Sequence, residues 1–509
     1  MEEQVRLDLL KSAAERNEWG QFATPPALAE EMARYVQKLW TTRTDKVRFL
    51  DPAIGTGSFF SALVRVGGRA WIESAEGIEL DKHFAQAARG LWAHEGLRVV
   101  EGDFTHARPT ASEKANLILT NPPYVRHHHL AQDDKLRLKA LGSQIAGTEV
   151  SGLSGLYCYF ILLAHEWLSE GGLSVWLVPS EFMDVNYGKA LQRYLTHRVT
   201  LLHIHRFDPR EVQFGDALVS SAIVVYRKSK PTDRHAVKFS FGGSLLHPKH
   251  QEKVPVSRLR GERKWSGFGH PDQSPREQEA VCTLASLFTI KRGIATGAND
   301  FFVMERGAAA RLGISEEFLK PLLPPPRHVS QTIIEGDDQG YPMLDPQLAV
   351  LDTDLSERDV KRACPALWKY LKAGEAQGVD KLYLAGKRYP WYRQEQRPPA
   401  PFLSTYMGRV RENGKPFRFF WNRSRAIATN VYLLLYPIGP LKLALDKNPA
   451  LIETTFELLQ EISGRTLVSE GRVYGGGLHK LEPGELGRID ATSFCERLAL
   501  RIDTQESLF

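Results

Sequence analysis

Roughly the first 230 residues alternate between short apolar runs and longer amphipathic segments. Short apolar runs predict strands, and apolar positions that recur about every 3.6 residues predict helices. The predicted strands are Val47–Asp51, Glu76–Leu80, Leu97–Glu101, Asn116–Thr120, Leu173–Val178, Thr200–Phe207 and Ala222–Tyr226, and the predicted helices include Pro26–Leu39, Phe59–Val66, Lys82–Ala93 and Tyr157–Ser169. Strands separated by crossover helices favour a mainly parallel, Rossmann-like α/β sheet with helices on both faces.

The alternation stops after the last of these strands. The stretch Arg227–His250 is rich in lysine, histidine and proline and resembles a linker. Beyond about Ser257, proline clusters, aromatics and short β-like runs indicate a separate α+β domain. With 509 residues the chain is too long to fold around one hydrophobic core of ordinary size. We therefore expect an α/β domain over residues 1–240 and an α+β domain over residues 241–509.

Composition places the chain among soluble globular proteins, with 42% hydrophobic and 25% charged residues. No run approaches the apolar length of a membrane-spanning helix, and the mixed, acidic N-terminus lacks the pattern of a secretory signal. The four cysteines are far apart, without a Cys-x-x-Cys pair: Cys158, Cys282, Cys364 and Cys495. This spacing argues against a zinc site or a disulfide framework and fits a reducing cytoplasm.

The charge distribution says more than the net charge of +6. Between Lys387 and Arg425 there are ten Lys/Arg against two Glu, with nine interleaved aromatics. That mixture suits phosphate contacts combined with contacts to bases. A basic, partly buried β-rich surface explains the same composition, so both interpretations stay open. Within the stretch, Arg393, Arg409 and Lys415 are the candidate nucleic-acid contacts.

The segment Phe49-Leu-Asp-Pro-Ala-Ile-Gly-Thr-Gly-Ser-Phe59 follows a strand and opens a helix. Gly55 and Gly57 allow a sharp turn and close approach of a ligand, although a purely structural turn has the same pattern. Glu79 ends the next strand, 28 residues after Asp51, where a carboxylate can accept both ribose hydroxyls. No Gly-Lys-Ser/Thr phosphate loop is present. A ligand with a ribose and no phosphates fits best, and S-adenosylmethionine is the obvious one.

Two further segments extend this donor site. Asp103 and Phe104 end the third strand, where the carboxylate can accept from the adenine amino group of the donor and the ring can pack on it. Upstream, Gly20-Gln-Phe-Ala-Thr-Pro-Pro26 leads into a helix, and we expect Thr24 to cap it. The amides at that helix start can face the carboxylate of the donor.

The run Leu117-Ile-Leu-Thr-Asn-Pro-Pro-Tyr124 ends a fourth strand and indicates an acceptor site. The lone pair of an exocyclic amine on a base is spread into the ring, so the amine is a poor nucleophile. The Asn121 side-chain oxygen and the Pro122 carbonyl can both accept its hydrogens and draw the lone pair toward a methyl group. Tyr124 offers an aromatic face to a flipped base, and Phe214 is a candidate second face.

Two other chemistries are not supported. No Pro-Cys pair stands where methylation of a ring carbon needs a covalent nucleophile, so direct transfer is implied. The run His127-His128-His129 invites a metal interpretation, but adjacent residues do not converge on one ion. We expect a solvated loop there and no metal.

The order of these segments resembles the γ-class adenine-N6 DNA methyltransferases of the Taq type, the modification enzymes of restriction–modification systems. The resemblance covers about residues 17–226. It matches Gln21–Pro26 to the cofactor-contact motif, Asp51–Gly57 to the glycine loop, Glu79 to the ribose ligand, Asp103-Phe104 to the acidic–aromatic pair and Asn121–Tyr124 to the catalytic tetrapeptide. Ala53 replaces another small residue. More weakly, Lys291–Phe302 and Val473–Leu481 look like the opening and closing segments of the recognition domain of the family.

The resemblance implies a class I methyltransferase domain, which binds S-adenosylmethionine, and a C-terminal target-recognition domain. It implies site-specific methylation of adenine in double-stranded DNA by a monomer in a prokaryotic cytoplasm, with a possible separate cognate restriction endonuclease. No fused nuclease is expected before residue 17. Methyltransferases acting on ribosomal RNA or on release-factor glutamine share the Asn-Pro-Pro-Tyr site and remain the alternative.

Overall fold

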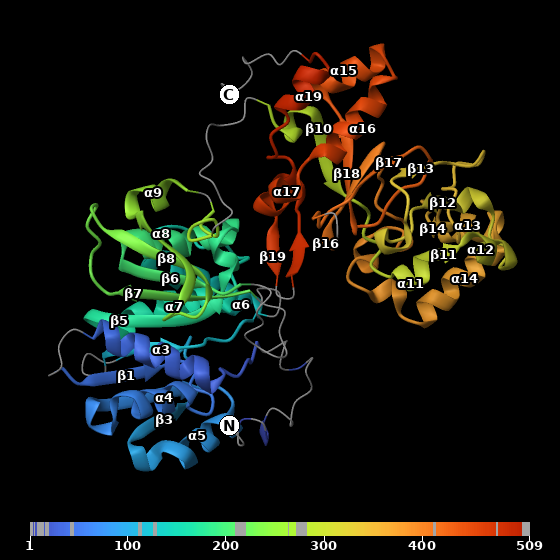
Figure 1. Ribbon diagram of the computed structural model, residues 1–509. Helices are drawn as coiled ribbons and strands as arrows, with labels where there is room; N and C mark the ends of the chain where they lie inside the picture. Colours follow the sequence, from blue (N-terminus) through green and yellow to red (C-terminus); the bar gives the residue numbers. More distant parts are fainter. Residues whose placement is uncertain are drawn as a thin grey trace. The chain divides into compact units, whose positions relative to one another are not determined.

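The computed structural model describes residues 4, 6–7, 15, 20–40, 45–109, 114–125, 130–208, 220–262, 264–270, 282–410, 414–474 and 477–500. The chain divides into two compact units. The first comprises Met1–Pro275 with Tyr474–Gly477, and the second comprises Arg276–Val473 with Leu478–Phe509. Each unit is described by itself (Figure 1).

A nine-stranded sheet forms the centre of the first unit. In spatial order its strands are β3 (Leu97–Glu101), β2 (Ile72–Glu79), β1 (Val47–Asp51), β4 (Ala115–Thr120), β5 (Leu168–Pro179), β7 (Ser221–Arg227), β6 (Thr200–Arg206), β8 (Ala236–Gly243) and β9 (Pro248–Pro255). Only β7 and β9 run antiparallel to their neighbours. The predicted mainly parallel, Rossmann-like α/β sheet is confirmed, and the seven strands predicted from the sequence all occur at the expected places.

Helices cover both faces of this sheet (Figure 1). One apolar cluster packs α3 (Pro26–Leu39), α4 (Ser58–Gly67) and α5 (Lys82–Trp92) on one face, and another packs α6 (Gln132–Ala146), α7 (Leu156–Trp167) and α8 (Lys189–His197) on the other. Strand β4 lies between them and is buried almost throughout, as its unbroken apolar run predicts for a strand covered on both sides.

The stretch predicted to be a linker folds as part of the sheet. Strand β8 pairs in parallel with β6 and β9 pairs antiparallel with β8, after which comes the short helix α9 (Val256–Gly261). The expected domain boundary at residue 240 therefore falls inside β8, and the first unit continues to Pro275. The boundary lies later than predicted because β8 and β9 are hydrogen-bonded to the sheet, although the alternation of apolar strands and helices in the sequence has already ended.

The second unit contains three small sheets. Their strands are β10 (Phe288–Arg292), β18 (Tyr432–Pro437), β15 (Phe402–Thr405), β17 (Phe419–Asn422) and β13 (Ile333–Ile334); β11 (Val303–Glu305), β14 (Leu348–Leu351) and β12 (Leu319–Leu322); and β16 (Met407–Arg409), β20 (Leu478–Lys480) and β19 (Arg472–Tyr474). Its helices are α10 (Leu284–Leu287), α11 (Asn299–Phe302), α12 (Arg306–Arg311), α13 (Glu357–Ala363), α14 (Pro365–Ala376), α15 (Gly439–Lys447), α16 (Leu451–Glu461), α17 (Gly464–Glu470), α18 (Pro483–Leu486) and α19 (Thr492–Arg497).

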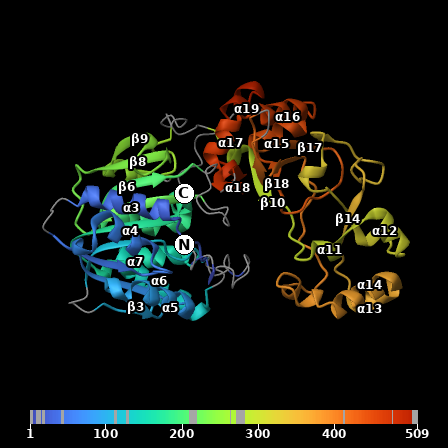
Figure 2. The ribbon, with the colours of Figure 1, turned by 60° about the horizontal axis from the view of Figure 1, so that its bottom comes forward.

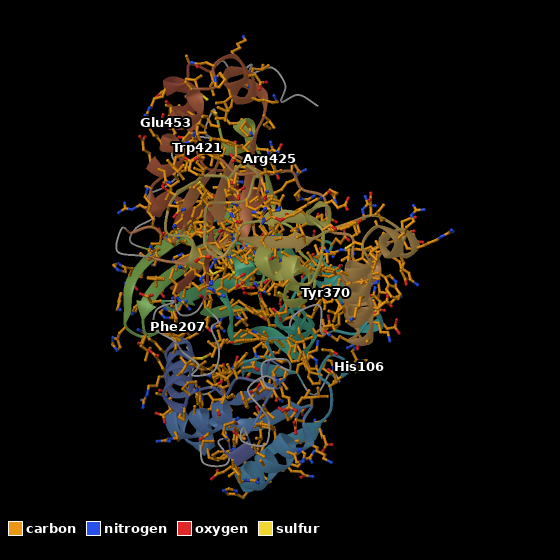
Figure 3. The ribbon with its side chains drawn as sticks, turned by 90° about the vertical axis from the view of Figure 1, so that its right-hand side faces the viewer. His106, Phe207, Tyr370, Trp421, Arg425 and Glu453 are labelled. Carbon is orange, nitrogen blue, oxygen red and sulfur yellow. The ribbon has the colours of Figure 1, made fainter. Side chains whose placement is uncertain are left out.

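Two of the three apolar centres of this α+β unit pack its longer helices. One packs α15, α16 and α19 against the five-stranded sheet, where Trp421 of β17 contacts Phe456 (Figure 3). The other packs α13 and α14 with the sheet of β11, β14 and β12, and Figure 2 shows these helices apart from α15 and α16. In neither unit does a described helix have the length and apolarity needed to cross a membrane.

Candidate active site

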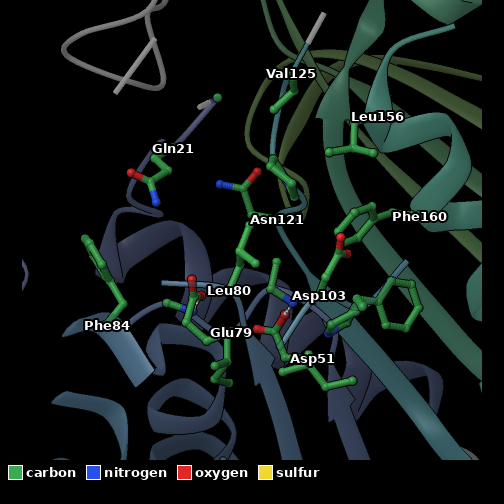
Figure 4. Close-up of a pocket in the computed structure, with 18 of the residues that line it drawn as sticks. Gln21, Asp51, Glu79, Leu80, Phe84, Asp103, Asn121, Val125, Leu156 and Phe160 are labelled. Atoms are coloured by element: carbon green, nitrogen blue, oxygen red, sulfur yellow. Dashed lines mark hydrogen bonds between the residues drawn. The ribbon is translucent and has the colours of Figure 1, made fainter. Parts of the chain in front are cut away.

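A cavity of about 320 Å³ opens at the carboxyl ends of β1, β2 and β4 in the first unit. This is the edge at which open α/β sheets bind ligands. Figure 4 shows the side chains of Asp51, Glu79, Asp103 and Asn121 gathered around it. The residues predicted for the donor and acceptor sites that line the cavity are Gln21, Thr24, Asp51, Ala53, Gly55, Glu79, Asp103, Phe104 and Asn121. Segments separated by up to 100 residues in sequence thus share one site.

Asp51 ends β1 and is buried, with 1% of its surface exposed. Its Oδ1 accepts hydrogen bonds from the Thr120 hydroxyl at 2.6 Å and from the Ala53 amide at 3.0 Å. Burial nevertheless dominates and raises the pKa of Asp51 to about 7, with the nearby charge of Glu79 adding to the increase. The carboxyl group therefore changes its charge near neutral pH.

Glu79 ends β2 and holds the glycine turn. Its Oε2 accepts the Gly55 amide at 2.9 Å and its Oε1 accepts the Asp81 amide at 2.9 Å. Each carboxylate oxygen keeps capacity for another donor. Gly55 has φ +54°, and a Cβ there would meet no atom within 4 Å, so the space beside its backbone is open. A ligand with hydroxyl groups can lie beside this open turn and donate to the carboxylate.

Asp103 and Phe104 follow β3 rather than ending it. The Asp103 Oδ1 accepts the Thr105 amide at 2.7 Å, and 39% of the side chain is exposed toward the cavity mouth. The Phe104 ring is buried against Phe160 and Trp167, with centroid distances of 5.0 and 5.7 Å. Phe104 thus belongs both to the core and to the cavity wall.

The orientation of the Asn121 side chain is fixed. Its amide nitrogen donates to the Phe22 carbonyl at 2.9 Å and to the Thr24 hydroxyl at 3.2 Å. A backbone carbonyl accepts only, so the amide cannot be rotated by 180° without losing this bond. The Asn121 Oδ1 is consequently turned away from Phe22. It is buried and has no hydrogen-bond partner among the described residues.

The segment before α3 is bound directly to the tetrapeptide. The Tyr124 amide donates to the Gly20 carbonyl at 3.0 Å. Gly20 has φ +61°, and a Cβ at this position would lie 2.3 Å from the Tyr124 amide nitrogen, so no other residue fits. Thr24 does not cap α3, as the sequence had led us to expect: Pro25 is the N-cap and no side chain caps it. The Thr24 hydroxyl is engaged by Asn121 instead.

Three predicted site residues that the structure describes are not brought to the cavity wall. Tyr124 is 9% exposed and its hydroxyl donates to the Leu177 carbonyl at 3.1 Å. Gly57 begins α4, and the Trp92 indole fills the space beside it. Neither of these nor Pro122 is among the residues that line the cavity. Phe214 lies outside the described residues, as does the run His127–His129.

Other cavity residues were not anticipated from the sequence. They include Gln4, Phe22, Thr56, Leu80, Phe84, Thr105, Asp134, Leu138, Leu156 and Phe160. Gln4 accepts the Thr56 hydroxyl at 2.7 Å, which brings the chain start to the glycine turn. Leu80 and Phe84 stand one and five residues after Glu79. The junction between strand and helix that follows this acidic residue could therefore have identified them from the sequence. Leu156 and Phe160 lie on α7, whose apolar sequence predicts only a buried helix. Nothing in the sequence indicated that they line a cavity.

Most aromatics of the basic stretch Lys387–Arg425 are core residues. Six of the nine are buried, and only Tyr389 is fully exposed, at 93%. Several of its cations are also engaged: the Lys415 amine donates to the Gln460 carbonyl, and Arg423 pairs with Glu335. The interpretation as a partly buried β-rich surface is correct for most of this stretch, and Tyr389 is the exception.

The cavity fits S-adenosylmethionine. A carboxylate and an open glycine turn suit the ribose, and apolar side chains such as Phe84 and Phe160 suit the adenine ring. Asn121, whose side-chain oxygen has no partner among the described residues, lines the same cavity. Fold and site together define a class I S-adenosylmethionine-dependent methyltransferase.

Comparisons with known proteins narrow this class. The family model of the Eco57I restriction-modification methylase matches residues 70–213, and that of the C-terminal domain of type II methyltransferase M.Eco57I matches residues 273–505. Type II methyltransferase M.AccI of Acinetobacter calcoaceticus is 26% identical over 495 residues, covering 94% of this chain and 86% of the relative. M.XamI of Xanthomonas campestris pv. amaranthicola is 26% identical over 478 residues, covering 92% and 84%.

A solved structure shares the fold. The Type IIL restriction-modification enzyme MmeI, in complex with DNA, aligns with a TM-score of 0.55 at 13% identity, covering 87% of this chain and 66% of that one. The chain belongs to the modification methyltransferases of restriction–modification systems. The order of its motifs fits the Taq-type γ class.

Proposed function

We propose that this chain transfers a methyl group from S-adenosylmethionine to N6 of an adenine flipped out of a specific sequence in double-stranded DNA. The orientation of Asn121 carries the proposal. Its amide nitrogen is held by Phe22 and Thr24, and its buried oxygen has no partner among the described residues. An unpaired buried acceptor costs about 1–3 kcal/mol, so the site is stabilised when a donor group enters. An exocyclic amine is such a donor.

In this proposal the residues of the chain activate the amine by accepting its hydrogens. Asn121 Oδ1 accepts one and the Pro122 carbonyl accepts the other, which withdraws the nitrogen lone pair from the ring. S-adenosylmethionine, when bound, supplies a methyl group on a positively charged sulfur. The N–C bond forms as the C–S bond breaks, and the extra amine proton leaves to water. No carbon-attacking thiol is needed.

Other cavity residues bind the donor in this scheme. Glu79 accepts hydrogen bonds from the ribose hydroxyls. Asp103 accepts a hydrogen bond from the adenine amino group, and Phe104 packs beside the adenine ring. A positively charged donor in the cavity would favour the ionised form of Asp51. The buried Tyr124 ring packs 5.5 Å from Phe22 and supports the backbone of the tetrapeptide, so it needs to move before it can stack on a base.

We assign the choice of sequence to the second unit, acting as a target-recognition domain, and catalysis to the first unit. A base stacked in a duplex cannot enter the cavity, so the target base must be flipped. The chain would act as a monomer on DNA in a prokaryotic cytoplasm, and protect host DNA from a separate restriction endonuclease.

A labelling experiment tests the substrate class. The purified chain is incubated with methyl-labelled S-adenosylmethionine and, separately, undigested genomic DNA, ribosomal RNA and release factor. We expect label in DNA only, and loss of labelling in Asn121→Ala. Asn186→Ala, an exposed asparagine of the same unit, is the matched control and keeps the activity. Label in RNA or in release factor instead of DNA contradicts the proposal.

A further inference from the structure

A thirteen-residue segment of the second unit, Lys381–Arg393, carries four cations and no acidic residue. It begins at the end of a 3-10 turn (Val379–Lys381), passes through a second (Ala385–Lys387) and follows α14. Tyrosine and tryptophan side chains are interleaved with the cations. It overlaps the start of the basic stretch Lys387–Arg425, in which Arg393 was expected to contact nucleic acid.

Alternate side chains of this segment anchor it to the body of the unit. The Arg388 guanidinium donates to the Thr296 carbonyl at 2.8 Å, to the Ala295 carbonyl and to the Gln394 side chain at 3.1 Å. The hydroxyl of Tyr392 donates to the Leu355 carbonyl at 2.7 Å, and the Trp391 indole packs against Phe301 and Phe302. The backbone is therefore held from several sides.

Two tyrosines and three of the cations of this segment point to solvent. Tyr389 is 93% exposed and Tyr383 is 74% exposed, the two most exposed aromatics among the described residues. The Lys387 amine lies 2.7 Å from the Tyr383 hydroxyl and 3.9 Å from its ring centroid. Lys381 and Arg393 are exposed and make no ion pair with any residue that the structure describes. Exposed tyrosines beside cations without an ion pair, on a fixed backbone, are the mixture that suits contacts to phosphates, sugars and bases.

We propose that the outward face of the Lys381–Arg393 segment is a contact surface for duplex DNA. Lys381, Lys387 and Arg393 would contact phosphates, and Tyr389 would pack against sugar and base edges in the adjoining groove. Charge complementarity selects this partner, because four cations without an acid match a polyanion. Arg388, Tyr392 and Trp391 already hold the loop in one conformation. Binding therefore costs less conformational entropy. The inference rests on the proposed function, since it names one surface by which the second unit holds its substrate.

Binding and methylation are measured separately on the same plasmid DNA, using the full-length wild-type chain and its full-length variants. We expect the salt dependence of the binding constant, as the slope of log K against log [salt], to decrease by about 1 for each cation removed in Lys387→Gln and Arg393→Gln. Tyr389→Ala weakens binding by about tenfold, whereas Tyr389→Phe keeps the ring and stays near wild type. Lys442→Gln with Lys447→Gln, two exposed lysines of α15, is the matched control and leaves the slope unchanged.

The outcomes separate the surface from the reaction. The altered residues are exposed, and an unchanged melting temperature and S-adenosylhomocysteine affinity verify that each variant is folded. Wild-type affinity and slope in the three segment variants, with normal methylation, overturn this inference and leave the proposed function standing. A wild-type chain that binds DNA through this segment yet transfers no methyl group to it overturns the function and leaves the surface. Equal losses in the α15 control overturn the assignment to this segment.

Discussion

At the scale of single residues, the site depends on how Asn121 is held. The Asn-Pro-Pro-Tyr run alone predicts that Asn121 is the hydrogen-bond acceptor for the amine. That Phe22 and Thr24 orient it could not be predicted, because they stand 99 and 97 residues away and meet it only when the segment before α3 reaches the end of β4. Thr24 was expected to cap a helix for the same reason: a local pattern reports local partners first.

Thr24→Val removes one of the two contacts that keep the Asn121 amide in place. We expect the turnover number to decrease by about fivefold, corresponding to roughly 1 kcal/mol for one hydrogen bond, with little change in S-adenosylmethionine affinity. Thr24→Ser keeps a hydroxyl and serves as the control. Steady-state kinetics with a DNA substrate measure both. Equal turnover in wild type and Thr24→Val would show that the Phe22 carbonyl alone suffices.

Asp51 predicts a pH-dependent donor affinity. Its pKa of about 7 is raised by burial above the usual 3.8, so the neutral acid dominates at pH 6 and the carboxylate at pH 8. A positively charged donor favours the carboxylate, so affinity increases as pH rises through 7, by up to about tenfold between pH 6 and 8. Titration calorimetry of wild type and Asp51→Asn measures this. A pH dependence that persists in Asp51→Asn contradicts the assignment.

The same shift has a stability consequence of opposite sign. Because the folded-state pKa is raised, Asp51 contributes stability that is fully present below about pH 4 and is lost as pH rises through 7. At pH 8 the buried, ionised Asp51 destabilises the free protein, and binding of the positively charged donor offsets this destabilisation.

At the scale of elements, the sequence predicted the strands of the buried sheet and missed the added hairpin. Strand β4 reads as a strand because it is apolar throughout. Strand β9 (Pro248–Pro255) contains Lys, His, Gln and Glu, and most of its residues are exposed because it is the edge of the sheet. Polar edge strands protect against aggregation, and the same polarity removes the pattern by which strands are predicted.

A buried polar network joins this added region to the rest. The His203 ring bonds to the Tyr35 hydroxyl at 2.7 Å and to the Ser240 hydroxyl at 2.7 Å, and His205 bonds to Ser240 at 2.8 Å. Burial lowers the pKa of His203 to about 2 and of His205 to about 4, so both rings are neutral at physiological pH. Ser240 of β8 is thus the shared partner of two buried histidines on β6.

Ser240→Ala leaves two imidazole nitrogens without partners. We expect it to lower the free energy of unfolding by about 1–3 kcal/mol, measured by urea denaturation. Ser257→Ala, at an exposed position of α9, is the control and changes stability by less than about 0.5 kcal/mol. If the two variants unfold alike, the network does not stabilise the sheet.

At the scale of the whole molecule, the two-part organisation was predictable from the change in sequence texture, and the boundary was not. The texture changes near residue 230, while the hydrogen-bonded sheet ends after residue 255. The recognition interpretation of the basic stretch was likewise too broad, since composition does not reveal which aromatics are buried. Of the nine aromatic residues in this stretch, only Tyr389 is exposed enough to contact DNA with its whole ring.

The donor cavity is built within the first unit, so its ligand should stabilise that unit. S-adenosylhomocysteine at about 100 times its dissociation constant is expected to add roughly 2.7 kcal/mol to the unfolding free energy, seen as a higher melting temperature. ATP at the same concentration is expected to cause no shift, because the glycine turn lacks a phosphate-binding Lys. A shift with ATP equal to that with S-adenosylhomocysteine contradicts the donor assignment.

The central claim is that the Asn121–Tyr124 site methylates the amino nitrogen of adenine within one DNA sequence. Its most direct test is to express the chain in a host without other modification enzymes, locate the methylated bases by sequencing and identify them by nucleoside mass spectrometry. The account predicts N6-methyldeoxyadenosine at a single position of one recurring sequence, absent with Asn121→Ala. N4-methyldeoxycytidine at that site, or unmodified DNA from a host that makes the folded protein, would contradict it.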